Sequence, residues 1–113
     1  MNSIEFSGSF TPAGCKWKKA KEAVTIGAGV QLKPLYSALK DKEKTAAVGL
    51  ANTVGAAGGY IQGGGHSPLG PWKGMGSDNA YQFTIVTADV SSPHECLISW
   101  YKWLIVYSTR ANM

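Results

Sequence analysis

The sequence predicts a single α+β domain, with a short β-α-β start followed by a glycine-rich loop and an interior strand. Three observations favour this fold class. Residues 23–27 form a β-branched run, residues 30–40 carry apolar side chains at helical spacing, and ten of the fourteen glycines fall between Gly49 and Gly76. A chain of 113 residues has room for one domain at most. Strand and helix signals that alternate along the chain favour packed layers over a helical bundle.

The first elements are short and separated by turn residues. Residues 4–10 (IEFSGSF) predict a short strand, and the following Thr-Pro-Ala-Gly sequence is typical of a turn. Residues 23–27 (AVTIG) predict a second strand, because β-branched side chains suit a pleated surface. A Gly-Ala-Gly sequence then turns the chain.

Residues 30–40 predict a helix. Pro34 falls in its first turn, where the missing N–H costs nothing. Apolar side chains recur at helical spacing: Val30, Leu35, Tyr36 and Leu39.

Two later segments predict extended structure. Residues 45–50 are a short apolar run, and residues 81–88 alternate and become apolar on both faces, as an interior strand does.

The glycine-rich segment lies at the centre of any functional interpretation. Glycine loses more backbone freedom on folding than other residues, so a folded chain keeps many glycines only at positive φ or at close backbone approaches. The glycines alternate with chemically varied side chains, which distinguishes the segment from a flexible linker. Two interpretations remain open from the residues alone: backbone that approaches a flat or phosphorylated ligand, and a glycine-rich bend packed against a sheet.

Two familiar nucleotide motifs are excluded. No Gly-Lys-Ser/Thr sequence follows the glycines, so the segment is not a Walker phosphate loop. No GxGxxG follows the early strand, and no acidic ribose partner stands at the expected distance, so a Rossmann fingerprint is absent as well.

The order of residues in this segment resembles a known family. The sequence TVGAAGGYIQGGGHSPL at residues 53–69, then GMGSDN at residues 74–79 and a strand ending VTAD, is similar to the flavin-binding, PCMH-type domain of FAD-linked oxidases. These are the vanillyl-alcohol oxidase or berberine-bridge-enzyme-like group, especially its fungal members. The upstream TIGAGVQ before a helix also fits, and the resemblance covers roughly residues 4–89.

The resemblance implies an FAD-dependent oxidoreductase and FAD as the partner. By the family pattern, residues 53–59 line the flavin and its diphosphate, residues 63–66 pass close to the isoalloxazine, and Val86 meets the adenine end through its backbone. The implied cofactor-binding residues are Thr53, Val54, Gly55, Gly58, Gly59, Gly63, Gly64, Gly65, His66 and Val86. His66 has two open interpretations, a hydrogen bond to loop backbone or a polar contact beside the flavin. No catalytic residue is assigned, because in this family the base and substrate pocket come largely from a later domain.

Ala51 departs from the family pattern in one informative way. Many relatives carry a cysteine here that bonds covalently to the flavin, and alanine has no thiolate to do so. The histidine that often forms a second flavin link, and the upstream loop that grips the pyrophosphate, have no counterpart in the sequence. The expectation is therefore FAD held non-covalently, in a fragment that lacks a substrate domain, so that catalysis by this chain alone stays uncertain.

Charge and cysteine content favour no other site. The net charge of +4 comes mostly from lysines in the first half, and no recognised nucleic-acid motif accompanies them, so a solvated surface is expected rather than a nucleic-acid interface. Cys15 and Cys96 stand far apart without a CxxC pattern, which argues against a metal site. Asp78 is expected to act as a turn or cap residue.

The last residues differ in composition from the rest. Residues 90–113 are predicted to be a tail unrelated to the domain of residues 1–89. Within the tail, residues 97–107 are apolar and aromatic but have about half the length that a membrane span needs. Val90 and Ser91 can be encoded by an intron-donor-like hexamer, so read-through of non-coding sequence is one hypothesis.

The beginning lacks a signal peptide, which favours the cytoplasm by default, although full-length relatives are often secreted. Two alternatives to the oxidoreductase remain: a basic nucleotide- or nucleic-acid-binding module without catalysis, and a non-functional product of a truncated gene.

Overall fold

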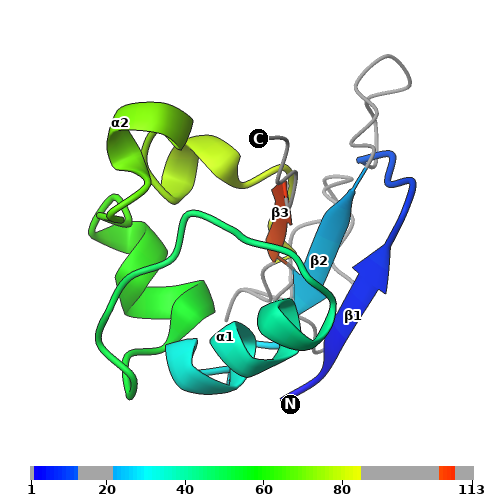
Figure 1. Ribbon diagram of the computed structural model, residues 1–113, viewed down its shortest axis with the longest axis horizontal. Coiled ribbons are helices and arrows are strands. Elements are labelled where there is room, and N and C mark those ends of the chain that lie inside the picture. Colours follow the sequence, from blue (N-terminus) through cyan, green and yellow to red (C-terminus); the bar gives the residue numbers. More distant parts are fainter. Residues whose placement is uncertain (1, 13–21, 85–104, 109–113) are drawn as a thin grey trace, which may run out of the picture.

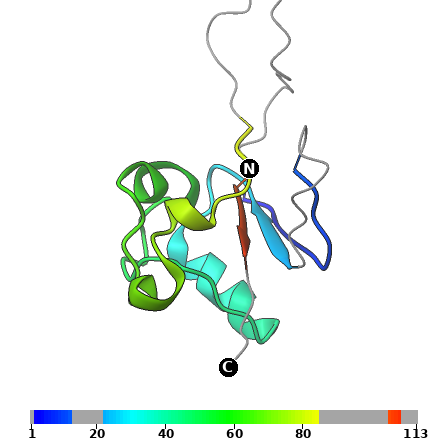
Figure 2. The same cartoon turned by 90° about the horizontal axis from the view of Figure 1, so that it is seen from above.

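Three short antiparallel strands form one sheet on which the rest of the fold packs. In this computed structural model, residues 2–12, 22–84 and 105–108 are described. The strands are β1 (Ile4–Ser7), β2 (Ala23–Ile26) and β3 (Ile105–Ser108), in the order β1-β2-β3. The helices lie together on one face of this sheet (Figures 1 and 2).

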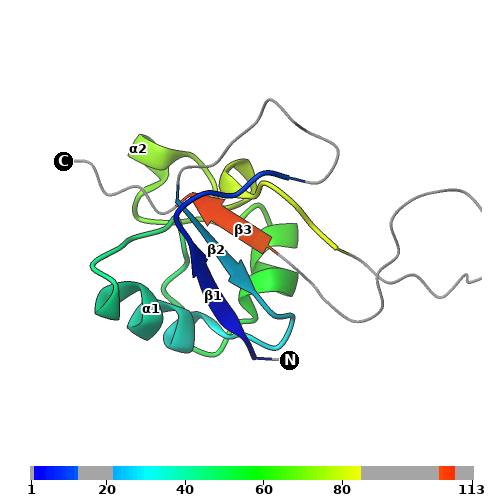
Figure 3. The same cartoon turned by 90° about the vertical axis from the view of Figure 1, so that its right-hand side faces the viewer.

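The central strand β2 supplies the buried middle of the sheet. Val24 and Ile26 are fully buried, as expected for β-branched residues with a strand on either side. Ile26 pairs with Ile4 of β1 and with Ile105 of β3, so the two neighbours are in register across β2 (Figure 3). The predicted strands at residues 4–10 and 23–27 are thus confirmed in their positions.

Helix α1 (Leu32–Asp41) confirms the helix predicted over residues 30–40. Leu32, Leu35 and Leu39 form the buried stripe that faces the sheet. Pro34 occupies the first turn as expected, and Val30 is buried just before the helix begins. Spacing of apolar residues therefore predicted both the helix and the side that packs.

The predicted β-α-β start is wrong, because the structure begins β-β-α and residues 45–50 form no strand. Ala46, Ala47 and Val48 are buried, as a strand would require. Their backbone, however, finds partners locally and in side chains: the Val48 amide donates to the Ala46 carbonyl over 2.9 Å. The burial of these side chains explains why residues 45–50 are apolar, and their backbone needs no neighbouring strand as a hydrogen-bond partner.

The interior strand predicted for residues 81–88 is also absent where the structure describes it. Residues 81–84 form no strand, and Tyr81 and Phe83 are exposed. Residues 85–88, including Val86, lie outside the described residues, as do Cys15 and Cys96.

The glycine-rich segment folds into short helical turns rather than one long loop. A π-helical turn, η1 (Ala56–Tyr60), is followed by α2 (Gly70–Lys73) and by a 3-10 turn, η2 (Ser77–Asn79). The predicted turn role of Asp78 is confirmed, since its carboxylate oxygen accepts a hydrogen bond from the Met75 amide over 2.8 Å.

In the described ranges no helix is long and apolar enough to cross a bilayer, and no group of three or more acidic, His or Cys side chains could hold a metal.

Candidate functional site

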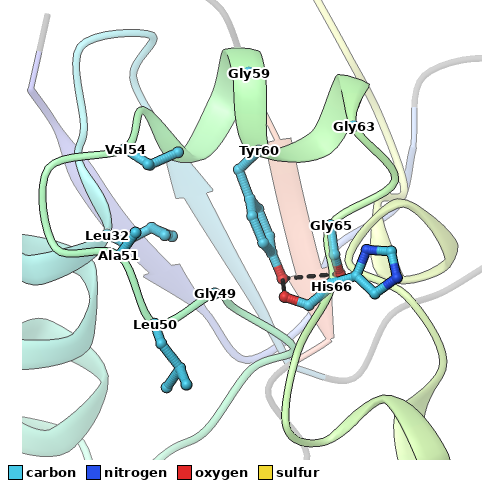
Figure 4. A pocket seen from close by; sticks show the side chains of 10 residues that line it. All are labelled: Leu32, Gly49, Leu50, Ala51, Val54, Gly59, Tyr60, Gly63, Gly65 and His66. Carbon is cyan, nitrogen blue, oxygen red and sulfur yellow. Dashed lines mark hydrogen bonds between the residues drawn. The ribbon is translucent and has the colours of Figure 1, made fainter.

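A surface pocket of about 330 Å³ opens where the glycine-rich segment faces the start of α1. Figure 4 shows Leu32, Leu50 and Val54 on one side of Tyr60, with Gly65 and His66 on the other. Ten residues line it: Leu32, Gly49, Leu50, Ala51, Val54, Gly59, Tyr60, Gly63, Gly65 and His66. The wall is therefore made of aliphatic side chains, one tyrosine, one histidine and bare backbone.

The pocket gathers half of the residues that the family resemblance implied. Five of these line it: Val54, Gly59, Gly63, Gly65 and His66. Thr53, Gly55, Gly58 and Gly64 lie in the same segment but do not line the pocket, and Val86 lies outside the described residues.

Sequence reasoning named Val54 but missed the rest of the aliphatic wall and the tyrosine. Leu50 is 74% exposed and Val54 is 36% exposed, and both side chains line the pocket. No spacing signal marked Leu32, Gly49 or Leu50 as pocket residues. Tyr60 did carry a signal, because it is a single large aromatic side chain among glycines.

The glycines divide into two groups according to what surrounds them. Among the described residues, a Cβ added at Gly55, Gly58 or Gly59 would meet nothing within 4 Å, so none of them covers this backbone. A Cβ at Gly49, by contrast, would come within 2.7 Å of the Tyr60 ring, and one at Gly76 within 2.8 Å. The first group leaves backbone accessible to a ligand, whereas the second makes room for the protein's own aromatic ring.

Tyr60 ties three backbone segments together through its hydroxyl group. The oxygen lies 3.1 Å from the carbonyl oxygen of Ala47, 2.9 Å from that of Gly65 and 3.1 Å from that of His66. The side chain is buried, and its hydroxyl has one hydrogen to donate, so it serves these three acceptors in turn. The far wall of the pocket is thereby fixed to the buried segment 46–48.

Burial raises the pKa of the Tyr60 hydroxyl to about 12 from its usual 10.0, with a smaller contribution from the nearby Tyr36. The folded state thus holds this proton more tightly than the unfolded chain does. Its stabilising contribution is complete below pH 10.0 and is lost as the pH rises towards about 12. We expect the difference in unfolding free energy between the parent and Tyr60→Phe to shrink over this range, measured by urea unfolding at several pH values. A difference that is independent of pH would contradict the assignment.

His66 contributes to the site mainly through its backbone. Its carbonyl accepts from Tyr60, and its exposed side chain stands at the pocket rim (Figure 4). Within the described part of the chain the imidazole makes no hydrogen bond, so the expected side-chain bond to loop backbone is not found there. A polar contact with a bound ligand is geometrically open to this ring.

The segment before η1 caps the start of α1. The Leu32 amide donates to the Val54 carbonyl and the Lys33 amide to the Asn52 carbonyl, each over 3.0 Å. Gln31 and Gly55 form an isolated β-bridge beside these bonds. The first amides of a helix have no partner within the helix itself. Here they bind the carbonyls of residues 52 and 54, and these bonds hold the near wall of the pocket against α1.

A turn after α2 supports the far wall from outside. The Gly76 amide donates to the Gly65 carbonyl over 2.7 Å, and the Ser77 amide and hydroxyl both donate to the Gly64 carbonyl. Gly64 and Gly65 have φ of +89° and +76°, which L side chains rarely adopt. The wall therefore consists of left-handed backbone held by hydrogen bonds on both sides.

Comparison with known proteins gives consistent matches. A family profile described as "FAD binding domain" matches residues 14–91. An uncharacterized FAD-linked oxidoreductase of Arthroderma benhamiae is 56% identical over 89 residues, which is 78% of this chain and 15% of that protein. A flavin-dependent oxygenase of Aspergillus ustus is 42% identical over 88 residues, 78% of this chain and 16% of that protein.

One solved structure is similar as well. It is a VAO-type flavoprotein of Myceliophthora thermophila C1, with a TM-score of 0.69 and 34% identity over 78% of this chain and 15% of that one. The chain thus spans only about 15% of the length of these similar proteins. Its fold corresponds to one part of a much larger flavoprotein architecture.

Proposed function

This chain belongs to the family of FAD binding domains, and on that premise we propose that it forms part of the cofactor site of an FAD-dependent oxidoreductase. Two features support this proposal. The pocket is bounded by aliphatic side chains and by backbone without side chains, a surface suited to a flat ring system. The observation that carries most weight is the space beside Gly55, Gly58 and Gly59, which no described residue fills and which a Cβ would enter.

The size of the pocket limits what it holds. At about 330 Å³ it lies at the lower end for small-molecule sites, which take roughly 300–1,000 Å³. FAD is a long dinucleotide, so the pocket accommodates one part of it and leaves the rest to other surfaces. We assign residues 53–59 to the flavin and diphosphate, residues 63–66 to the ring side, and Val86 to the adenine end.

Attachment of the cofactor is proposed to be non-covalent. Ala51 lines the pocket, and its methyl side chain cannot form a bond to the flavin. Leu32, Leu50 and Val54 instead provide apolar contact and exclude water from the bound ring.

When bound, FAD supplies the acceptor for a hydride removed from the substrate, with oxygen as the proposed final acceptor. The residues described here bind and orient the cofactor, and they do not act on the substrate. His66 can offer a hydrogen bond at the pocket rim. The substrate, an alcohol, sugar or amine by the family pattern, is proposed to meet other parts of a longer protein.

Titration of the purified chain with FAD tests the proposal. We expect saturable one-to-one binding, seen as quenching of flavin fluorescence, together with a higher midpoint of thermal unfolding, because a ligand that binds only the folded state stabilises it. DNA and RNA titrations at several salt concentrations serve as the control for a basic binding module. Absence of saturable FAD binding, with or without salt-dependent nucleic-acid binding, would contradict the proposed function.

A further inference from the structure

We propose that Tyr60 is a positioning residue for the cofactor. It acts through residues 63–66, which it restrains by a hydroxyl group shared between the Gly65 and His66 carbonyls. This inference rests on the proposed function, because it assumes that residues 63–66 lie beside bound FAD. The protein needs such a device because this segment is rich in glycine and would otherwise sample many conformations.

The hydroxyl group supplies the first part of the argument. It contacts carbonyl oxygens five, six and thirteen residues away, those of Gly65, His66 and Ala47. A phenylalanine would keep the ring but leave these carbonyls without the hydroxyl donor. Buried polar groups without partners are unfavourable, so the segment would move to seek water.

The ring supplies the second part. Three glycines from separate parts of the chain approach it so closely that a Cβ at any of them would lie within about 3 Å: Gly49, Gly65 and Gly76. Close packing therefore fixes the ring from several sides. If residues 63–66 move, the hydroxyl group stays in place and its hydrogen bonds to them break. Figure 4 shows the ring extending from η1 towards Gly65 and His66.

The link to the pocket is direct. Gly65 and His66 line it, and the Gly65 carbonyl also accepts from the Gly76 amide over 2.7 Å. This carbonyl therefore has two donors, the outer turn and the Tyr60 hydroxyl, whose one hydrogen it shares with the Ala47 and His66 carbonyls. Loss of the hydroxyl removes one of the two restraints on the pocket wall.

Tyr36 offers a matched control. It is a half-buried tyrosine on α1 whose hydroxyl donates to the Val48 carbonyl over 3.3 Å. It lines another cavity of about 200 Å³ with Val48 and Leu69, and that cavity shares no lining residue with the candidate pocket. Tyr36→Phe therefore removes a tyrosine hydroxyl from the same core without releasing residues 63–66.

The test compares the parent, Tyr60→Phe and Tyr36→Phe as full-length chains. We expect Tyr60→Phe to raise amide hydrogen exchange at Gly76 and Ser77, whose acceptors are the Gly65 and Gly64 carbonyls, by about tenfold, with no such rise in Tyr36→Phe. We expect its FAD dissociation constant to rise about tenfold, corresponding to loss of one buried hydrogen bond. The visible absorption band of bound flavin should change shape in Tyr60→Phe alone.

A second variant reaches Tyr60 without touching its hydroxyl. Gly76 does not line the pocket, but an added Cβ would press on the Tyr60 ring at 2.8 Å. Gly76→Ala is therefore expected to weaken FAD binding in the same direction, and it provides the test if Tyr60→Phe does not fold.

The outcomes separate the two proposals. Unchanged exchange in Tyr60→Phe, or changed exchange with unchanged FAD affinity and flavin spectrum, would overturn the positioning role while the proposed function stands. Equal effects of Tyr36→Phe and Tyr60→Phe on FAD would also overturn it, since the effect would then reflect general loosening. A parent chain that binds no FAD would refute the proposed function, and the positioning role with it, whatever the exchange rates show.

Discussion

Replacing Gly65 with alanine is expected to destabilise the fold by about 3 kcal/mol or more, through two separate costs. The φ of +76° costs an L residue roughly 1–2 kcal/mol. The new Cβ would also lie 2.8 Å from the Gly76 Cα and 3.0 Å from its nitrogen, which are backbone atoms that cannot rotate away. Moving Gly76 would lengthen its 2.7 Å hydrogen bond to the Gly65 carbonyl. Urea unfolding of the parent and variant measures the loss.

Gly64→Ala is the matched comparison for this prediction. Its φ of +89° imposes a similar backbone cost, but the one described atom that the added Cβ would meet within 4 Å is the Met75 Cε, the end of a flexible side chain, at 2.7 Å. We expect a smaller loss of about 1–2 kcal/mol. Gly8→Ala, where a Cβ meets nothing within 4 Å in the described part of the chain, should change stability little. Equal losses for Gly64→Ala and Gly65→Ala would show that contact with Gly76 is not limiting.

Replacing Gly59 with leucine is expected to weaken FAD binding by up to about a hundredfold while the fold is kept. Gly59 lines the pocket, and the space beside it is open, so the chain tolerates the side chain but the ligand meets it. Forcing extra atoms into an occupied space costs about 1–3 kcal/mol. Stability without FAD should be equal or higher, because glycine in a helical turn is less favourable than leucine. Fluorescence titration and thermal unfolding give the two quantities.

Gly70→Leu controls for the general effect of adding a leucine. Gly70 begins α2 and does not line the pocket, and no described residue would lie within 4 Å of its added Cβ. We expect this variant to bind FAD as the parent does. If Gly59→Leu also kept the parental affinity, the pocket would not be where FAD binds.

The sequence was informative where a periodic pattern corresponds to one kind of packing. The leucine stripe of α1 fits a helix with one buried face, and the β-branched run of β2 fits a strand between two others. The prediction of a strand or extended segment at residues 45–50 did not give a strand, because burial alone does not distinguish a strand from a buried connection. There the Val48 carbonyl accepts from Tyr36 and the Ala47 carbonyl from Tyr60, so side-chain hydroxyls replace a neighbouring strand.

The candidate site was predictable as a region but not in its details. The glycine-rich order identified the segment, and half of the implied residues meet in one pocket. Sequence could not reveal that Gly49 and Gly76 face Tyr60 and not a ligand, because this depends on where distant backbone meets the ring. Nor could it reveal the exposed Leu50, since position relative to the pocket comes only from the folded chain.

The capped start of α1 bears on how a charged cofactor is accommodated. Leu32 and Lys33 donate their amides to carbonyls of residues 52–54, Pro34 has no amide hydrogen, and Leu35 donates to Gln31. In many nucleotide-binding folds the corresponding amides receive phosphate oxygens. Here a diphosphate could use them only by displacing the protein's own carbonyl groups and opening the pocket wall. Neutralisation of the phosphate charge must therefore fall to other groups of the protein.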